Sequence, residues 1–196
     1  MKDRELRVMA GAVRFERRED DAPGSIGTLS GYAALFRSPS VDLGGFVEEI
    51  EPGAFKDTVG ADDIRALVDH ESHLILGRNR SGTLELHEDE TGLAMSIALP
   101  DTSMGRDIAV SVGRGDVFGC SFSFQTIEDD WHMVDGMPRR TLKKVRLYDV
   151  GPVTFPAYPD TSVAVRCLAK FSPAPLANEG WRMRASHQRQ RHARAQ

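Results

Sequence analysis

Short segments in which apolar and polar residues alternate dominate the sequence and favour a fold built mainly from β-strands. The clearest is a hairpin, in which residues 83–87 and 93–99 alternate on either side of the turn residues 88–92. Its second arm puts four apolar side chains on one face: Leu93, Met95, Ile97 and Leu99. Further strands are predicted at 7–15, 31–36, 46–50, 64–70, 117–127 and 141–150, the last two joined by a polar hairpin that contains Asp135-Gly136.

Helical signals are fewer. Residues 100–103 offer helix caps and predict a helix through Ile108 and Val112, which Gly113 to Asp116 end. Pro52-Gly53-Ala54-Phe55 suits the entry to a short helix. Many short strands with one or two flanking helices predict a mainly-β (α+β) fold that closes into a barrel or closed sheet.

Length and composition predict one domain with a tail. The 196 residues divide into a folded domain at 1–168 and a segment at 169–196 that is rich in Pro, Ala, Arg, Gln and His. That segment is expected to form a flexible basic tail, since it can bury little apolar surface.

The net charge of -4 does not favour nucleic acid as a partner, and no apolar run is long enough to cross a membrane. Two cysteines, Cys120 and Cys167, indicate a reducing compartment rather than a disulfide framework.

A serine lies on the polar face of one predicted strand. Phe118, Cys120, Phe122 and Phe124 alternate on one face, and Gly119, Ser121, Ser123 and Gln125 on the other. The aromatic face can pack the core, while a substrate backbone can approach the small polar face. Ser121 is therefore a candidate nucleophile, and an ordinary solvent-facing serine is the simpler alternative. Cys120 shares the phenylalanine face and is expected to be a buried, inert thiol.

A histidine and a carboxylate occur at similar places in other strands. His70 closes the apolar run from Ile64 and is either a base or a hydrogen-bonded structural histidine. Asp149 is in phase with Val145 and Leu147, so it is expected to be buried and paired, either with an imidazole or with Arg146 or Lys144. Together with Ser121 they are the minimum set for acyl transfer by a serine hydrolase. His73 completes a His-x-x-His motif, one residue shorter than the zinc motif of metalloproteases.

The chain contains five motifs whose order and spacing resemble those of the prohead maturation proteases of tailed bacteriophages. That family is related to the herpesvirus assemblin serine proteases. The motifs lie between about Gly31 and Val165: Gly31-Tyr32-Ala33 with Phe36; Glu51-Pro52-Gly53-Ala54-Phe55; Leu67-Val68-Asp69-His70 with Leu76-Gly77-Arg78; Cys120-Ser121-Phe122-Ser123-Phe124; and Asp149-Val150-Gly151-Pro152-Val153 with Pro156-Ala157-Tyr158-Pro159.

The resemblance implies an assemblin-like closed β-barrel with flanking helices. It also implies that His70 is the catalytic histidine, Ser121 the nucleophile and Asp149 the third member of the site. The herpesvirus relatives use a second histidine in the third role, so His73 and His132 stay as alternatives. Ser123 stands where the family often has glycine, and its side chain is expected to narrow the cleft or alter the main-chain geometry around the oxyanion.

The same resemblance implies a serine endopeptidase that needs no metal or cofactor. Its expected partners are the scaffolding segment of the major capsid protein and its own chain, which it cleaves inside the viral procapsid in the host cytoplasm; a homo-oligomer is compatible with this. Two other functions stay open. One is a non-enzymatic capsid-assembly or scaffolding module, and the other is a metal-dependent hydrolase that uses His70, His73 and a carboxylate.

Overall fold

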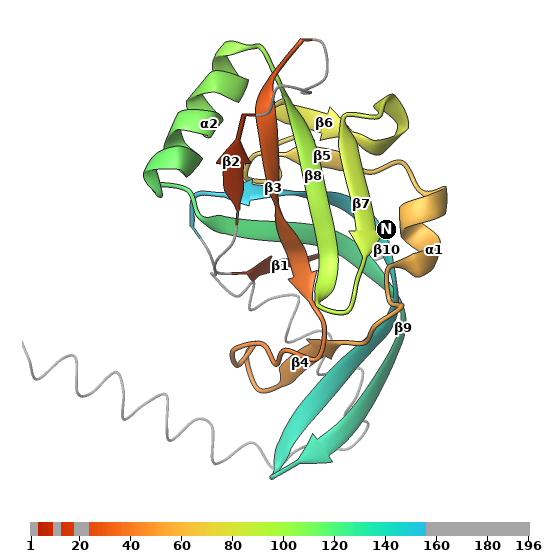
Figure 1. Ribbon diagram of the computed structural model, residues 1–196. Coiled ribbons are helices and arrows are strands. Elements are labelled where there is room, and N and C mark those ends of the chain that lie inside the picture. The colour runs from red at the N-terminus through yellow and green to blue at the C-terminus, as the bar shows by residue number, and fades with distance from the viewer. Residues whose placement is uncertain (1–3, 10–12, 18–23, 156–196) are drawn as a thin grey trace, which may run out of the picture.

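Two β-sheets packed face to face form the body of the computed structural model, which describes residues 4–9, 13–17 and 24–155 (Figure 1). The six-stranded sheet runs β1 (Glu5–Met9), β9 (Gly119–Val134), β10 (Met137–Val153), β5 (Arg65–Leu67) and β6 (Ile75–Arg78), with β4 (Val47–Ile50) also paired to β10. The four-stranded sheet runs β2 (Arg14–Glu16), β3 (Ser25–Leu35), β8 (Gly92–Pro100) and β7 (Leu84–Glu88). In Figure 1, β3, β8 and β7 cross in front of β9 and β10.

Helices cover the edges of this pair of sheets. They are α1 (Lys56–Ala61), the 3-10 turn η1 (Asn79–Ser81) and α2 (Ser103–Arg114). The predicted cap is present, since the Thr102 hydroxyl accepts a hydrogen bond from the amide of Gly105, and the helix ends at Gly115, where φ is 80°. Within the described part of the chain, no helix is long and apolar enough to cross a membrane.

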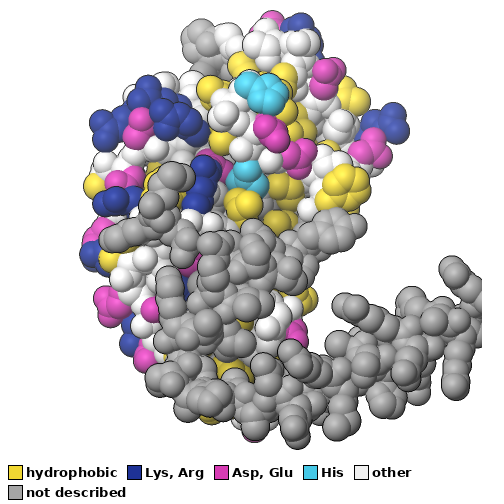
Figure 2. Space-filling model, turned by 180° about the vertical axis from the view of Figure 1, so that it is seen from behind, with side chains coloured by type: hydrophobic (Ala, Val, Ile, Leu, Met, Phe, Trp, Pro, Cys, Tyr) yellow, Lys and Arg dark blue, Asp and Glu magenta, His cyan; other side chains and the backbone are white. Residues whose placement is uncertain are grey.

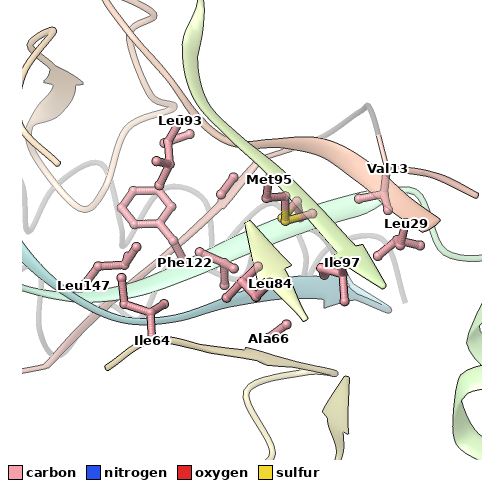
Figure 3. Packing of buried hydrophobic residues seen from close by; sticks show 14 of the residues in the cluster. Val13, Leu29, Ile64, Ala66, Leu84, Leu93, Met95, Ile97, Phe122 and Leu147 are labelled. Carbon is pink, nitrogen blue, oxygen red and sulfur yellow. The ribbon is translucent and has the colours of Figure 1, made fainter. Parts of the chain in front are cut away.

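Apolar side chains from both sheets meet in a single core (Figure 3). Leu29, Met95 and Ile97 come from the four-stranded sheet, and Phe122 and Leu147 come from the other. The expected apolar face of the 93–99 arm is confirmed, because all four of its side chains are buried. Ile108, Ala109 and Val112 of α2 join the same cluster, so the helix is part of the core rather than an accessory.

The mainly-β character is confirmed, but no closed barrel is found among the described residues. The chain leaves β6 at Arg78, passes through η1 and turns at Gly82, where φ is 69°. This turn carries it into β7 of the other sheet, so consecutive strands fail to form one continuous ladder. The expectation of a closed, assemblin-like barrel is therefore replaced by two packed sheets.

Several predicted strands have different limits. The strand expected at 7–15 is two strands, β1 and β2, which pair in different sheets with partners far away in the sequence. The strand expected at 64–70 ends at Leu67. Phe118, assigned to the core face, precedes β9 and is exposed. The last strand or helix turn expected at 162–168 and the basic tail expected at 169–196 lie outside the described residues.

The pairing of β9 with β10 in one long hairpin positions most of the residues of the candidate site. Its turn lies at Asp135 and Gly136 as predicted, with φ of 51° and 79°. Further along the hairpin, Ser121 pairs with Gly151 and Ser123 pairs with Asp149. These pairs lie on the face of the sheet opposite to Phe122 and Phe124, which point into the core.

Gly151 allows β5 to lie against β10. A Cβ atom added at this position would stand 1.8 Å from the carbonyl oxygen of Leu67, the last residue of β5. That distance is far below any van der Waals contact, so every other residue type would push the two strands apart. The close approach brings the turn that follows β5 over the neighbourhood of Ser121.

A cluster of four charged side chains fixes β1 to the rest of its sheet. We call Glu5, Arg7, Glu48 and Arg140 the buried ion cluster. Arg140 donates to Glu5 over 2.7 Å and to Glu48 over 3.0 Å, while Arg7 donates to the same carboxylates over 2.8 and 2.7 Å. Burial by itself raises the pKa of Glu5, but hydrogen bonding to Arg140 and the charges of Arg140 and Arg7 outweigh it and lower that pKa to about 2.

Replacing Gly151 by alanine should destabilise the fold strongly, because the new methyl group collides with the backbone of β5. We expect a loss of about 3 kcal/mol or more in the free energy of unfolding, measured by urea denaturation. Gly113→Ala is the control: nothing lies within 4 Å of a Cβ there, so alanine in this helix should stabilise by about 0.5–1 kcal/mol. Equal stability of the Gly151→Ala protein and the parent would contradict the close approach.

The buried ion cluster should make stability depend on pH in the acid range. The pKa of Glu5 is lower in the folded state than its ordinary value of 4.5, so its contribution is complete above pH 4.5 and is lost as pH falls toward about 2. The contribution amounts to about 3 kcal/mol. Urea denaturation between pH 2 and 6 should therefore show a flatter profile for Glu5→Gln than for the parent, whereas Glu90→Gln, at an exposed position, should keep the parent's slope. Parallel profiles for Glu5→Gln and the parent would show that this carboxylate is not held by the cluster.

Candidate active site

Three side chains from three separate segments meet on the outer face of the six-stranded sheet. The Ser121 Oγ of β9 lies 2.5 Å from Nε2 of His70, which is in the turn after β5. Nδ1 of the same imidazole is hydrogen-bonded to Oδ1 of Asp149 on β10. A hydroxyl, an imidazole and a carboxylate thus form one continuous hydrogen-bonded chain, with the imidazole in the middle.

The strand register explains how the serine reaches this face. Phe122 and Phe124 are buried in the core, so Ser121 and Ser123 project from the other side of β9. Both serines are fully buried. The alternative of an ordinary solvent-facing serine at Ser121 is therefore wrong, and a reacting molecule must displace covering groups before it can reach the hydroxyl.

A β-bulge gives Asp149 its position. Leu147 pairs with Phe124, yet Asp149, two residues later, pairs with Ser123, which is directly adjacent to Phe124 in β9. The extra residue, Tyr148, shifts the alternation by one, so Leu147 faces the core while Asp149 faces the histidine. Asp149 is buried as expected, with 2% of its surface exposed, but it lies on the opposite face from the one that its phase with Val145 and Leu147 indicates.

His70 is held in a strained turn rather than at the end of a strand. Asp69 and His70 both have positive φ, 49° and 60°, in the left-handed region that non-glycine residues seldom adopt. The Asp69 carboxylate accepts hydrogen bonds from the amide and the hydroxyl of Thr154, both over 2.8 Å, and the Asp69 amide donates to the carbonyl of Pro152 over 3.1 Å. The end of β10 therefore fixes the turn and aims the imidazole at Ser121.

Solvent access to the three groups is unequal. The His70 side chain is 16% exposed, whereas Asp149 and Ser121 are almost or completely inaccessible. Figure 2 shows the back of the molecule, where histidine side chains lie among acidic and hydrophobic ones. The imidazole is thus the member of the set that a molecule arriving from solvent can contact first.

The alternative histidines do not join this group. His73 is 73% exposed and lies 3.7 Å from the carboxylate of Glu71. His132 is exposed near the tip of the β9–β10 hairpin, opposite Arg139. Among the residues that the structure describes, no cluster of three or more His, Cys, Asp or Glu side chains could hold a metal ion.

The neighbouring thiol is placed as expected. Cys120 is fully buried on the core face, with its sulfur 3.6 Å from that of Met95. Burial raises the pKa of this thiol to about 12. A thiol that stays protonated and points away from His70 is no rival to the Ser121 hydroxyl.

The second partner of Asp149 is Arg4, which sequence reasoning missed. Oδ2 of Asp149 forms an ion pair with the guanidinium of Arg4, just before β1. The expected alternatives pair elsewhere: Lys144 lies 2.6 Å from Asp57, and Arg146 lies 3.7 Å from Asp62. No local pattern links Arg4 to Asp149, since the contact depends on the pairing of β1 with β9.

The arrangement is suited to activating a hydroxyl group. Nε2 of His70 is within reach to accept the hydroxyl proton, and Asp149 fixes the opposite ring nitrogen as a donor and stabilises the imidazolium that forms. A buried, hydrogen-bonded carboxylate next to the imidazole keeps the ring in one tautomer and one orientation.

Comparison with known proteins shows the family of this chain. The model of the caudovirus prohead serine protease family matches residues 13–172, a span that contains all three side chains. No curated protein matches the sequence. A similar solved structure is that of the bacteriophage T4 capsid assembly protease, with a TM-score of 0.43 and 9% identity, covering 78% of this chain and 99% of that one.

Proposed function

Because the chain belongs to the caudovirus prohead serine protease family, its function is prohead maturation, and we propose that it acts there as an endopeptidase with Ser121 as nucleophile. The observation that carries this assignment is the hydrogen-bonded chain from Ser121 through His70 to Asp149. His70 is the general base and acid, and Asp149 orients it.

The proposed reaction uses each member of this hydrogen-bonded chain. Ser121 Oγ attacks the carbonyl carbon of the scissile peptide bond while Nε2 of His70 takes the hydroxyl proton. The tetrahedral intermediate collapses when His70 returns that proton to the leaving amine, and an acyl-enzyme remains. Water, activated in turn by His70, then releases the acid product and restores Ser121.

The proposed substrates are the scaffolding segment of the major capsid protein and the protease itself, cleaved inside the procapsid. One feature of the chain fits a slow enzyme that acts in a confined space. The nucleophile is fully buried, so cleavage requires prior displacement of covering groups. Confinement in a shell raises the effective concentration of substrate, so modest intrinsic activity is sufficient.

Replacing Ser121 by alanine should abolish processing without unfolding the protein. We expect the full chain, co-expressed with the major capsid protein of the same phage, to shorten that protein, and Ser121→Ala to leave both proteins at full mass. Ser81→Ala, at an exposed serine of η1, is the matched control and should process normally. Intact mass spectrometry reads the outcome. Capsid protein shortened by the Ser121→Ala chain would favour a different nucleophile, and loss of processing with a chelator would favour a metal-dependent hydrolase.

Replacing Asp149 by asparagine should leave the shape of the site but remove the charge that stabilises the imidazolium. The rate of capsid-protein cleavage should fall by about 10⁴-fold, as expected when the carboxylate of such a triad is neutralised. Single-turnover cleavage, followed over hours by gel densitometry, is the measurement. A rate within tenfold of the parent would transfer the third role to another residue and would refute the assignment of Asp149.

A further inference from the structure

The buried carboxylate of Asp149 is shared between two cationic or potentially cationic groups. Its Oδ1 is hydrogen-bonded to His70, and its Oδ2 is paired with Arg4. Arg4 uses a second nitrogen, Nε, to donate to the hydroxyl of Ser123. Its guanidinium carbon also lies 5.3 Å from the centre of the Tyr148 ring, the bulge residue next to Asp149. Contacts with Asp149, Ser123 and Tyr148 therefore fix the position of the Arg4 guanidinium group.

We propose that Arg4 is a positioning residue for the reaction, acting through Asp149. The inference rests on the proposed function, in which Asp149 orients His70. A carboxylate with 2% exposure is costly to keep charged unless a cation compensates it, and a neutral imidazole alone does not. Arg4 supplies that charge and, by binding Oδ2, fixes the carboxylate plane so that Oδ1 stays on Nδ1 of His70.

Arginine suits this role better than lysine. The guanidinium presents several N–H donors in a rigid plane, so one nitrogen can bind Asp149 while another binds Ser123. A lysine ammonium carries the same charge on a flexible stem and cannot reproduce this fixed fork. Ser123 lies two residues after the nucleophile, and its hydroxyl holds Arg4 in place by accepting this hydrogen bond.

The fold keeps Arg4 at this position because β1, the strand that directly follows it, is anchored on the opposite face of the sheet. Glu5 and Arg7 of β1 belong to the buried ion cluster and point toward β4 and β10. Leu6 pairs with Ser123, so the start of β1 is registered beside the site. Arg4 precedes residue 13, where the match to the family model begins, so the matched segment does not contain this contact.

The test measures the reactivity of the Ser121 hydroxyl directly with a fluorophosphonate probe. In this reaction the serine oxygen bonds to phosphorus, fluoride leaves, and His70 takes the hydroxyl proton. We expect Arg4→Ala to lower the labelling rate of the full chain by about 10- to 100-fold, the scale of the loss when a residue that orients a metal-ligating side chain is removed. Millimolar guanidinium chloride should restore part of that rate, and Arg4→Lys should retain more activity than Arg4→Ala.

The controls separate positioning from a merely structural effect. Arg106→Ala removes an arginine of α2 that has similar exposure and is paired with Asp101, and it should neither slow labelling nor respond to guanidinium. Sodium chloride at the same concentration should not rescue Arg4→Ala. Thermal unfolding verifies that each variant is folded at the assay temperature. Ser123→Ala alone should slow labelling. Added to Arg4→Ala it should cause no further loss, because the hydrogen bond between Arg4 and Ser123 is already absent there.

The outcomes distinguish this inference from the proposed function. A rate for folded Arg4→Ala within twofold of the parent would overturn the role of Arg4. A slow Arg4→Ala variant that neither guanidinium nor lysine improves would also overturn it. Labelling of Ser121→Ala at the parent rate, or no labelling of the parent, would instead refute Ser121 as the nucleophile, and the inference about Arg4 would fall with it.

Discussion

The contact between Gly151 and the carbonyl of Leu67 is the constraint on which the site depends. It lets β5 lie directly against β10, and the turn that carries His70 follows from the end of β5. Asp69 then ties that turn to Thr154 at the far end of β10. The imidazole is therefore placed by backbone proximity and local hydrogen bonds, at the expense of two residues with left-handed backbone conformations.

Buried charge connects this site to the rest of the sheet. Asp149 is inaccessible and needs both its imidazole and a cation, and the cation comes from the segment just before β1. The strand that follows, β1, contributes Glu5 to the buried ion cluster, where Arg140 stabilises the ionised carboxylate. The segment from Arg4 to Arg7 thus makes ionic contacts on both faces of the sheet, so the docking of β1 and the geometry around Asp149 are coupled.

The elements that could be predicted from the sequence are those that hydrophobic periodicity and turn-forming residues indicate locally. The β7–β8 hairpin, α2 and the buried phenylalanine face of β9 are all local patterns, and each is present. The bulge at Tyr148 was not predictable, because it reverses the face of Asp149 without leaving a signal in residue types. The pairing of Arg4 with Asp149 and the arrangement of the strands in two sheets, in place of the expected barrel, were not predictable either. Both depend on strand pairings between distant segments.

One hydroxyl, activated by an imidazole and a buried carboxylate, is the proposed chemical centre of the molecule. The most direct measurement is peptide mapping by mass spectrometry of the full chain after reaction with a fluorophosphonate. We expect a single phosphonylated residue, Ser121, and no adduct once the protein is unfolded before the reaction. An adduct on another serine, or an equal distribution over several, would contradict it.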